Sequence, residues 1–146
     1  MLDITTTRDT IKIVMTAVLT DIDLAETQVL RYLTAHKIGV DPFAIRILLR
    51  EALANAIMHG SDGDDARTVE MKLSCSPEAV RLTVMDEGQG FSPEELPDFD
   101  LLQESGRGLA LMRIYADDVI YNEKGNCVTM IKSIPASLGL AAGGKQ

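Results

Sequence analysis

The sequence predicts an α/β (α+β) two-layer sandwich, in which a mixed, mostly antiparallel sheet carries its helices on one face. The apolar patterns follow the order strand, helix, helix, strand, strand, helix, strand, strand. Short turns at Pro77-Glu78 and at residues 124–126 join successive strands, and strands joined so closely pair antiparallel. With 146 residues, the chain is long enough for one ordinary domain with its own core.

The first part of the chain is expected to supply a strand and a helix. Residues 1–10 are polar and rich in threonine, so we expect a flexible segment or a short edge strand there. The β-branched run at residues 11–19 predicts a strand. Thr20 can cap the helix that follows, which should end near Gly39.

A second helix has a clear start at Asp41-Pro42, a capping side chain followed by proline at the first helical position. The helix should continue to Gly60. It is apolar nearly all round, which predicts that it is covered on both sides.

The second half of the sequence predicts four strands and one helix. The expected elements are hairpin strands at 68–74 and 80–85, a helix at 109–115, and further strands at 119–121 and 127–134. We therefore expect a flexible segment at 1–10, a single folded domain at 11–135 and a disordered tail at 136–146.

The composition excludes several classes of function. A net charge of −8 opposes a nucleic-acid-binding surface, which needs a basic patch. No apolar run approaches the ~20 residues of a membrane span, and the N-terminus lacks the features of a signal peptide, so we expect a cytoplasmic protein. Cys75 and Cys127 are far apart and form no CxxC, which predicts buried, reduced thiols.

The functional prediction depends first on the stretch EALANAIMHG, residues 51–60. Glu51 and Asn55 are four residues apart, so they share one face of an otherwise apolar helix, and His59 continues that face. Buried polar groups are costly unless they are paired. This face therefore has separate partners in the core or borders a polar site. For these residues alone, a solvated Glu and a capping Asn explain the pattern equally well.

A first glycine-rich stretch, MDEGQGF, occupies residues 85–91. Asp86 ends a predicted strand, and Gly88 and Gly90 would let the backbone approach a flat ring without a Cβ in the way. A simple turn after a strand would use the same residue types.

A second glycine-rich stretch, ESGRGL, occupies residues 104–109. Gly106, Arg107, Gly108 and Leu109 should open a helix, where unobstructed backbone N–H groups bind anions. Arg107 could contact a phosphate or point outward to Glu104.

Together, and in this order, the three stretches resemble the N, G1 and G2 boxes of the GHKL (histidine-kinase-like ATPase) superfamily. The anti-sigma-factor serine/threonine kinases are the most similar members, and the resemblance covers roughly residues 11–134. It implies the Bergerat-type ATP-binding fold, with ATP and Mg²⁺ as ligands. Residues 91–105 correspond to a short, acidic ATP lid.

The resemblance also implies a role for each residue of the three boxes. Asn55 would bind Mg²⁺, and Glu51 would act as the general base. The nucleotide-binding residues would be Asp86, Gly88 and Gly90 for the adenine base, and Gly106, Arg107, Gly108 and Leu109 for the triphosphate. His59 could touch phosphate or cap its helix. Where the family usually has a threonine after the glycine of the last hairpin, this chain has Asn126, which substitutes for it unless water holds the base.

The function implied is that of an ATP/Mg-dependent protein serine/threonine kinase acting as an anti-sigma-factor-type, partner-switching regulator. It would phosphorylate a Ser or Thr of a STAS-type antagonist, with a sigma factor and that anti-anti-sigma protein as partners and a homodimer as the assembly. The alternative is a non-catalytic ATP-binding module that switches protein partners. The catalytic domain of a histidine kinase is less favoured, because we expect no room for a dimerisation helix pair with a phosphoacceptor histidine.

Overall fold

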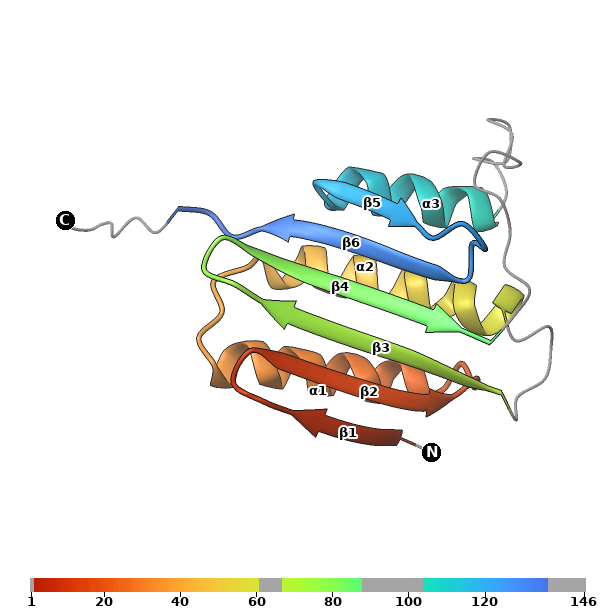
Figure 1. The fold of residues 1–146 in the computed structure, drawn as a ribbon, viewed down its shortest axis with the longest axis horizontal. Coiled ribbons are helices and arrows are strands. Elements are labelled where there is room, and N and C mark those ends of the chain that lie inside the picture. The colour runs from red at the N-terminus through yellow and green to blue at the C-terminus, as the bar shows by residue number, and fades with distance from the viewer. Residues whose placement is uncertain (1, 61–66, 88–103, 137–146) are drawn as a thin grey trace.

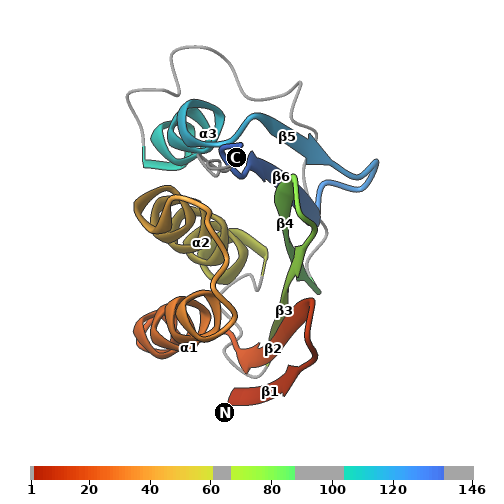
Figure 2. The ribbon, with the colours of Figure 1, turned by 90° about the vertical axis from the view of Figure 1, so that its left-hand side faces the viewer.

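The computed structural model describes residues 2–60, 67–87 and 104–136. In this part of the chain, a six-stranded sheet forms one layer, and three α-helices pack side by side on one of its faces (Figures 1 and 2). The predicted two-layer sandwich is therefore confirmed. The expected lid and tail, residues 91–103 and 137–146, lie outside the described residues.

The sheet has the strand order β1-β2-β3-β4-β6-β5. Its strands are β1 (Leu2–Thr6), β2 (Thr10–Thr16), β3 (Thr68–Cys75), β4 (Ala79–Asp86), β5 (Asp118–Tyr121) and β6 (Cys127–Ser133). Each neighbouring pair in the described residues is antiparallel, so the sheet lacks the parallel pairing that a mixed sheet would have. The reason lies in the connections. Two helices between β2 and β3 return the chain to the end where β2 finished, and β6 inserts between β4 and β5 (Figure 1).

The N-terminal residues form the edge strand, one of the two alternatives for this segment. β1 pairs with β2 from Leu2 opposite Met15 to Thr6 opposite Ile11. Strand β2 ends at Thr16, earlier than its β-branched run suggests, because the chain turns there: the Val18 N–H donates to the Thr16 carbonyl at 2.8 Å.

The helices are α1 (Asp21–Ala35), α2 (Pro42–Asn55) and α3 (Glu104–Tyr115). Helix α2 starts as predicted, with Asp41 Oδ1 accepting a hydrogen bond from the Phe43 N–H at 3.0 Å. Thr20 precedes α1 as expected, but its side chain makes no capping hydrogen bond. Helix α2 lies between α1 and α3 and against the sheet, which is the expected cover on both sides (Figure 2).

The end of α2 differs from the prediction of one regular helix to Gly60. The α-helix stops at Asn55, and a π-helical turn, η1 (Ala56–Gly60), continues it. Wider turns of this kind are rare and often occur at functional sites. Apolar spacing could not distinguish the two, because the π-helical turn spans only five residues, too few to show a period of its own.

The core lies between the sheet and the helices. Inward-facing residues alternate with outward-facing ones along β2, β3 and β4, and these strands bury the inward-facing residues almost completely. The largest buried side chains include Ile13, Met71 and Leu82 from the sheet and Leu48, Leu53 and Met112 from the helices. Because α2 contributes so much of this core, the polar residues at its C-terminal end are held in a rigid element.

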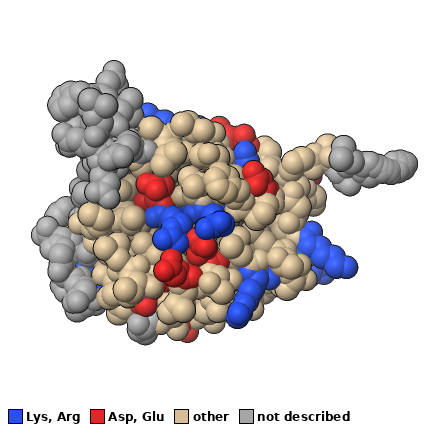
Figure 3. Space-filling view, turned by 180° about the vertical axis from the view of Figure 1, so that it is seen from behind, with Lys and Arg blue, Asp and Glu red and all other residues tan. Residues whose placement is uncertain are grey.

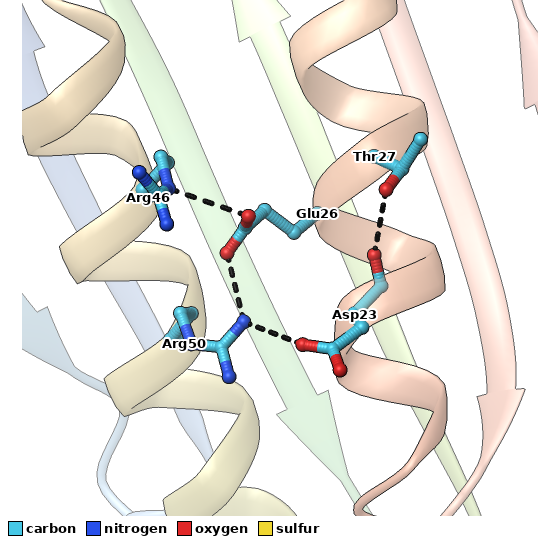
Figure 4. A network of polar contacts seen from close by, with 5 residues as sticks. All are labelled: Asp23, Glu26, Thr27, Arg46 and Arg50. Atoms are coloured by element: carbon cyan, nitrogen blue, oxygen red, sulfur yellow. Dashed lines mark hydrogen bonds and ion pairs between the residues drawn. The ribbon is translucent and has the colours of Figure 1, made fainter.

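Ionic contacts join α1 to α2 on the exposed side of the helix layer (Figures 3 and 4). Arg50 Nη1 lies 2.8 Å from Asp23 Oδ1 and 2.9 Å from Glu26 Oε1, and Arg46 Nε lies 3.3 Å from Glu26 Oε2. Hydrogen bonds to Asp23 and then Glu26 raise the pKa of the Arg50 guanidinium above its ordinary value. The network fixes the packing of the two helices through four charged side chains.

Both cysteines are free, as predicted, but they are only partly buried. Cys75 lies at the very end of β3, and Cys127 lies beside Met85 on the sheet face away from the helices. Burial, followed by the charge of Asp9, raises the pKa of the Cys75 thiol to about 11. Among the described helices, none is both long enough and apolar enough to cross a membrane.

Candidate functional site

Glu51 and Asn55 lie one turn apart at the C-terminal end of α2, on the side that meets α3. The contact is made at Gly108. A Cβ atom at this position would lie 2.9 Å from Glu51 Oε1, 3.3 Å from Asn55 Nδ2 and 3.6 Å from Asn55 Oδ1. Cβ atoms are essentially never found as close as 2.9 Å to another heavy atom, so only glycine fits here without a shift. The structure therefore brings two predicted site residues of α2 against one from the second glycine-rich stretch.

That stretch lies inside α3, which begins at Glu104 and not at Leu109 as expected. Gly106 and Arg107 thus belong to the first turn of the helix, where backbone N–H groups lack intrahelical acceptors. The side chain of Leu109 is buried, so it packs in the interior. The side chains of Arg107 and His59 lie outside the described residues, and both alternatives for each stay open.

Asp86 is the last residue of β4, and its side chain belongs to the face that meets the helices. Val80, Leu82 and Val84 are the buried, helix-facing residues of this strand, and Asp86 continues their alternation. It stands opposite the fully buried Val69 of β3. Strand β4 also contacts the η1 turn at the end of α2. Gly88 and Gly90 lie outside the described residues.

These segments gather at one end of the molecule. Figure 1 shows the C-terminal ends of α2 and β4 and the first turn of α3 together at that end, in agreement with the contacts of α2 with α3 and of β4 with η1. The arrangement places a carboxylate and a carboxamide beside a helix N-terminus, with a second carboxylate at the end of the neighbouring strand. It offers oxygen ligands for a hard cation and backbone N–H groups for an anion.

Asn126 contacts Asp86 directly. Its Nδ2 donates to the Asp86 carbonyl at 3.1 Å, and its own carbonyl accepts from the Asp86 N–H at 2.9 Å. Asn122, which the sequence reasoning did not single out, donates from Nδ2 to Asn126 Oδ1 at 2.8 Å. The Asn-x-x-Gly pattern at residues 122–125 indicates a turn, but nothing in it pointed to Asp86.

The charge of Asp86 also affects a neighbouring thiol. Burial, then the charges of Asp86 and Glu70, raise the pKa of Cys127 above its ordinary value. Within residues 2–60, 67–87 and 104–136, no three His, Cys, Asp or Glu side chains come close enough together to hold a metal ion.

Comparisons with known proteins find similar sequences over most of the chain. A family model described as the histidine kinase-like ATPase domain matches residues 5–132. Similar proteins include the anti-sigma F factors of Anoxybacillus flavithermus (32% identical) and Geobacillus kaustophilus (34% identical), each over 105 residues, 66% of this chain and 72% of the relative. The anti-sigma F factor of Clostridium perfringens is 31% identical over 87 residues, 55% of this chain and 62% of its own length. The match to the family model includes every residue predicted for the site.

Proposed function

Because the chain belongs to the histidine kinase-like ATPase domain family, we propose that it binds ATP with Mg²⁺ where α2, α3 and β4 meet. It then transfers the γ-phosphoryl group to a Ser or Thr of a protein partner. The similarity to anti-sigma F factors supports the further proposal that it is an anti-sigma-factor-type regulator. Its partners are then a sigma factor and a STAS-type antagonist, and the antagonist carries the accepting hydroxyl.

The observation that carries this proposal is the contact of Gly108 with Glu51 and Asn55. A phosphate-binding helix start is useful for phosphoryl transfer only if a base and an oxygen ligand lie beside it. The absence of a side chain at residue 108 keeps the backbone of α3 close to both polar groups.

Each residue has a distinct role in the proposed reaction. Asn55 holds the ion through its amide oxygen, and bound Mg²⁺ supplies neutralisation of charge on the phosphate oxygens. Glu51 accepts the proton of the attacking hydroxyl while the hydroxyl oxygen bonds to phosphorus and ADP leaves. Asp86 accepts a hydrogen bond from the exocyclic amine of adenine. Guanine has an oxygen at that position, so Asp86 selects ATP over GTP.

The decisive experiment is phosphoryl transfer in vitro from labelled ATP to a STAS-type antagonist. We expect Glu51→Gln to abolish transfer while ATP affinity is retained, because only the proton acceptor is lost. A suitable control is Glu70→Gln, since Glu70 lies on β3 and its carboxylate is exposed and near Lys12. Wild-type protein as inactive as Glu51→Gln would exclude the kinase. If the inactive wild-type protein still bound ATP, its function would be that of the non-catalytic, partner-switching module.

We also propose a homodimer. Among the described strands, β1 lies at the edge of the sheet with β2 as its one neighbour, and Leu24 of α1 is an exposed large hydrophobic residue. Both features support contact with a second copy of the chain. Light scattering after size-exclusion chromatography gives the mass in solution. The proposal would be contradicted if the protein remained monomeric at concentrations up to about 100-fold above a typical micromolar Kd for dimer dissociation.

A further inference from the structure

We infer that Asn122 and Asn126 act as a pair of positioning residues that fix Asp86 for recognition of the base. We call these two residues the asparagine clamp. The inference rests on the proposed function, because it assigns the clamp to the nucleotide selectivity of that site. It differs from the family-based expectation, in which the residue after Gly125 would itself help to bind the base.

The clamp begins with a turn that the side chain of Asn122 stabilises. Its Oδ1 accepts hydrogen bonds from three backbone N–H groups, those of Gly125 at 2.7 Å, Asn126 at 3.0 Å and Cys127 at 3.2 Å. Gly125 has a φ of 79°, in the left-handed region that favours glycine. The connection from β5 to β6 is thus held by this side chain together with backbone hydrogen bonds, from the Gly125 N–H to the Asn122 carbonyl at 3.1 Å and from the Asn122 N–H to the Cys127 carbonyl at 3.0 Å.

The next step links this turn to the main chain of Asp86. Asn122 Nδ2 donates to Asn126 Oδ1 at 2.8 Å, which orients the Asn126 amide so that its Nδ2 donates to the Asp86 carbonyl at 3.1 Å. The Asp86 N–H donates to the Asn126 carbonyl at 2.9 Å. Both backbone polar groups of Asp86 are therefore bonded to Asn126, one residue beyond the last strand pair, Met85 with Cys127.

The other side of the strand end is held as well. Glu87 Oε1 accepts a hydrogen bond from the Thr68 N–H, the first residue of β3, at 2.7 Å. The segment around Asp86 is therefore bonded to the start of β3 on one side and to the clamp on the other. Such double anchoring is what a specificity-determining carboxylate requires, because hydrogen-bond discrimination depends on placement to within about 0.5 Å.

The exposure of the clamp favours positioning over a general role in stability. Asn122 is exposed and Asn126 is only partly buried, so neither contributes much to the core. Both ends of the Asn126 amide have partners in the protein. Its Oδ1 accepts from Asn122 Nδ2, and its Nδ2 donates to the Asp86 carbonyl. Asn126 therefore acts on the base through Asp86.

The test measures the affinities for ATP and GTP by calorimetry in the presence of Mg²⁺, together with the melting temperature. We expect Asn126→Ala to reduce the ATP-to-GTP preference about tenfold, the size expected when one hydrogen bond is lost. The melting temperature should change little. Asn122→Asp keeps the oxygen that holds the turn but removes the donor to Asn126, so it should reduce the preference in the same direction. Lys124→Ala, an exposed side chain of the same turn, is the matched control and should retain the wild-type preference.

A double-mutant cycle separates positioning from direct contact. In an Asp86→Asn background, Asn126→Ala should have no further effect on the preference, because the carboxylate through which it acts is gone. Additive effects of the two substitutions would overturn the inference. An unchanged preference in folded Asn126→Ala and Asn122→Asp would overturn the inference alone. Wild-type protein that bound neither nucleotide would overturn the proposed function and the inference together.

Discussion

Gly108 of α3 faces Glu51 of α2 so closely that a Cβ atom at residue 108 would come within 2.9 Å of the Glu51 carboxylate. The nearest atom lies at the far end of a flexible side chain, so we expect an added methyl group to displace the carboxylate and leave the backbone in place. The absence of a Cβ atom at residue 108 therefore leaves room for the carboxylate of Glu51, the proposed base. It gives rise to the first of four expectations.

Gly108→Ala should impair activity more than stability. Replacing a glycine within a helix by alanine is worth up to about 1 kcal/mol, which offsets the close contact, so the free energy of unfolding should change by less than about 1 kcal/mol. Displacement of the Glu51 carboxylate should reduce phosphoryl transfer at least about tenfold, because misplaced catalytic groups lose effective concentration.

The matched control for this substitution is Gly39→Ala. A Cβ there would meet Ile134 Cγ2 at 3.6 Å, an ordinary van der Waals contact. Stability is measured by urea unfolding, and activity with the STAS-type antagonist. Full activity of a stable Gly108→Ala variant would show that the Glu51 carboxylate need not stay where the structure has it.

The N-terminal cap of α2 should contribute to the stability of the protein, and that of α1 should not. Asp41 accepts a hydrogen bond from the Phe43 N–H, so Asp41→Ala should cost about 1 kcal/mol of unfolding free energy. Thr20 makes no such bond, so Thr20→Ala should cost less than about 0.5 kcal/mol. Equal losses for the two variants in urea unfolding would mean that the Asp41 hydrogen bond does not contribute as a cap.

Arg50→Gln should destabilise the protein by about 1 kcal/mol, the upper part of the range for exposed ion pairs. The Glu26 side chain is only 15% exposed and would lose one of its two arginine partners, although Arg46 would remain. The loss should shrink in 1 M NaCl, where the Debye length is about 3 Å. The exposed Arg31 of α1 supplies the control, Arg31→Gln. If the loss of stability did not depend on salt, its cause would be the packing of the aliphatic part of the Arg50 side chain.

Cys75 should make the protein less stable at alkaline pH. Burial raises the pKa of its thiol from 9.0 to about 11, so between these values the unfolded chain has released a proton that the folded chain retains. The unfolding free energy therefore falls as pH rises through this window. In Cys75→Ala the fall in melting temperature from pH 9 to 11 should be shallower. An identical slope for both proteins would show that Cys75 titrates normally in the folded state.

Local signals in the sequence were sufficient for much of this fold. The start of α2 depends on Asp41 and Pro42, which act on their immediate neighbours, and it was predicted correctly. The shared face of Glu51 and Asn55 follows from helix geometry alone, and both side chains lie near Gly108. Such features need no knowledge of distant parts of the chain.

The features that were missed depend on contacts between distant segments. Helix α3 begins before its glycines, at Glu104, because packing of Gly108 on α2 favours a helix that propensity alone disfavours. The sequence left two alternatives for the polar residues of β1, because the choice of a strand depends on pairing with β2. Asn122 acts on Asp86, 36 residues earlier, through Asn126, and no local pattern could reveal this.

The strand order has a consequence for synthesis of the protein on the ribosome. Strand β6 is the last to be translated, yet it lies between β4 and β5. Until residue 133 has left the exit tunnel, β5 has no neighbour in the sheet and β4 has an open edge. A nascent chain can pair its first four strands early, but the end of the sheet that holds Asp86 is completed only after β6 has been synthesised.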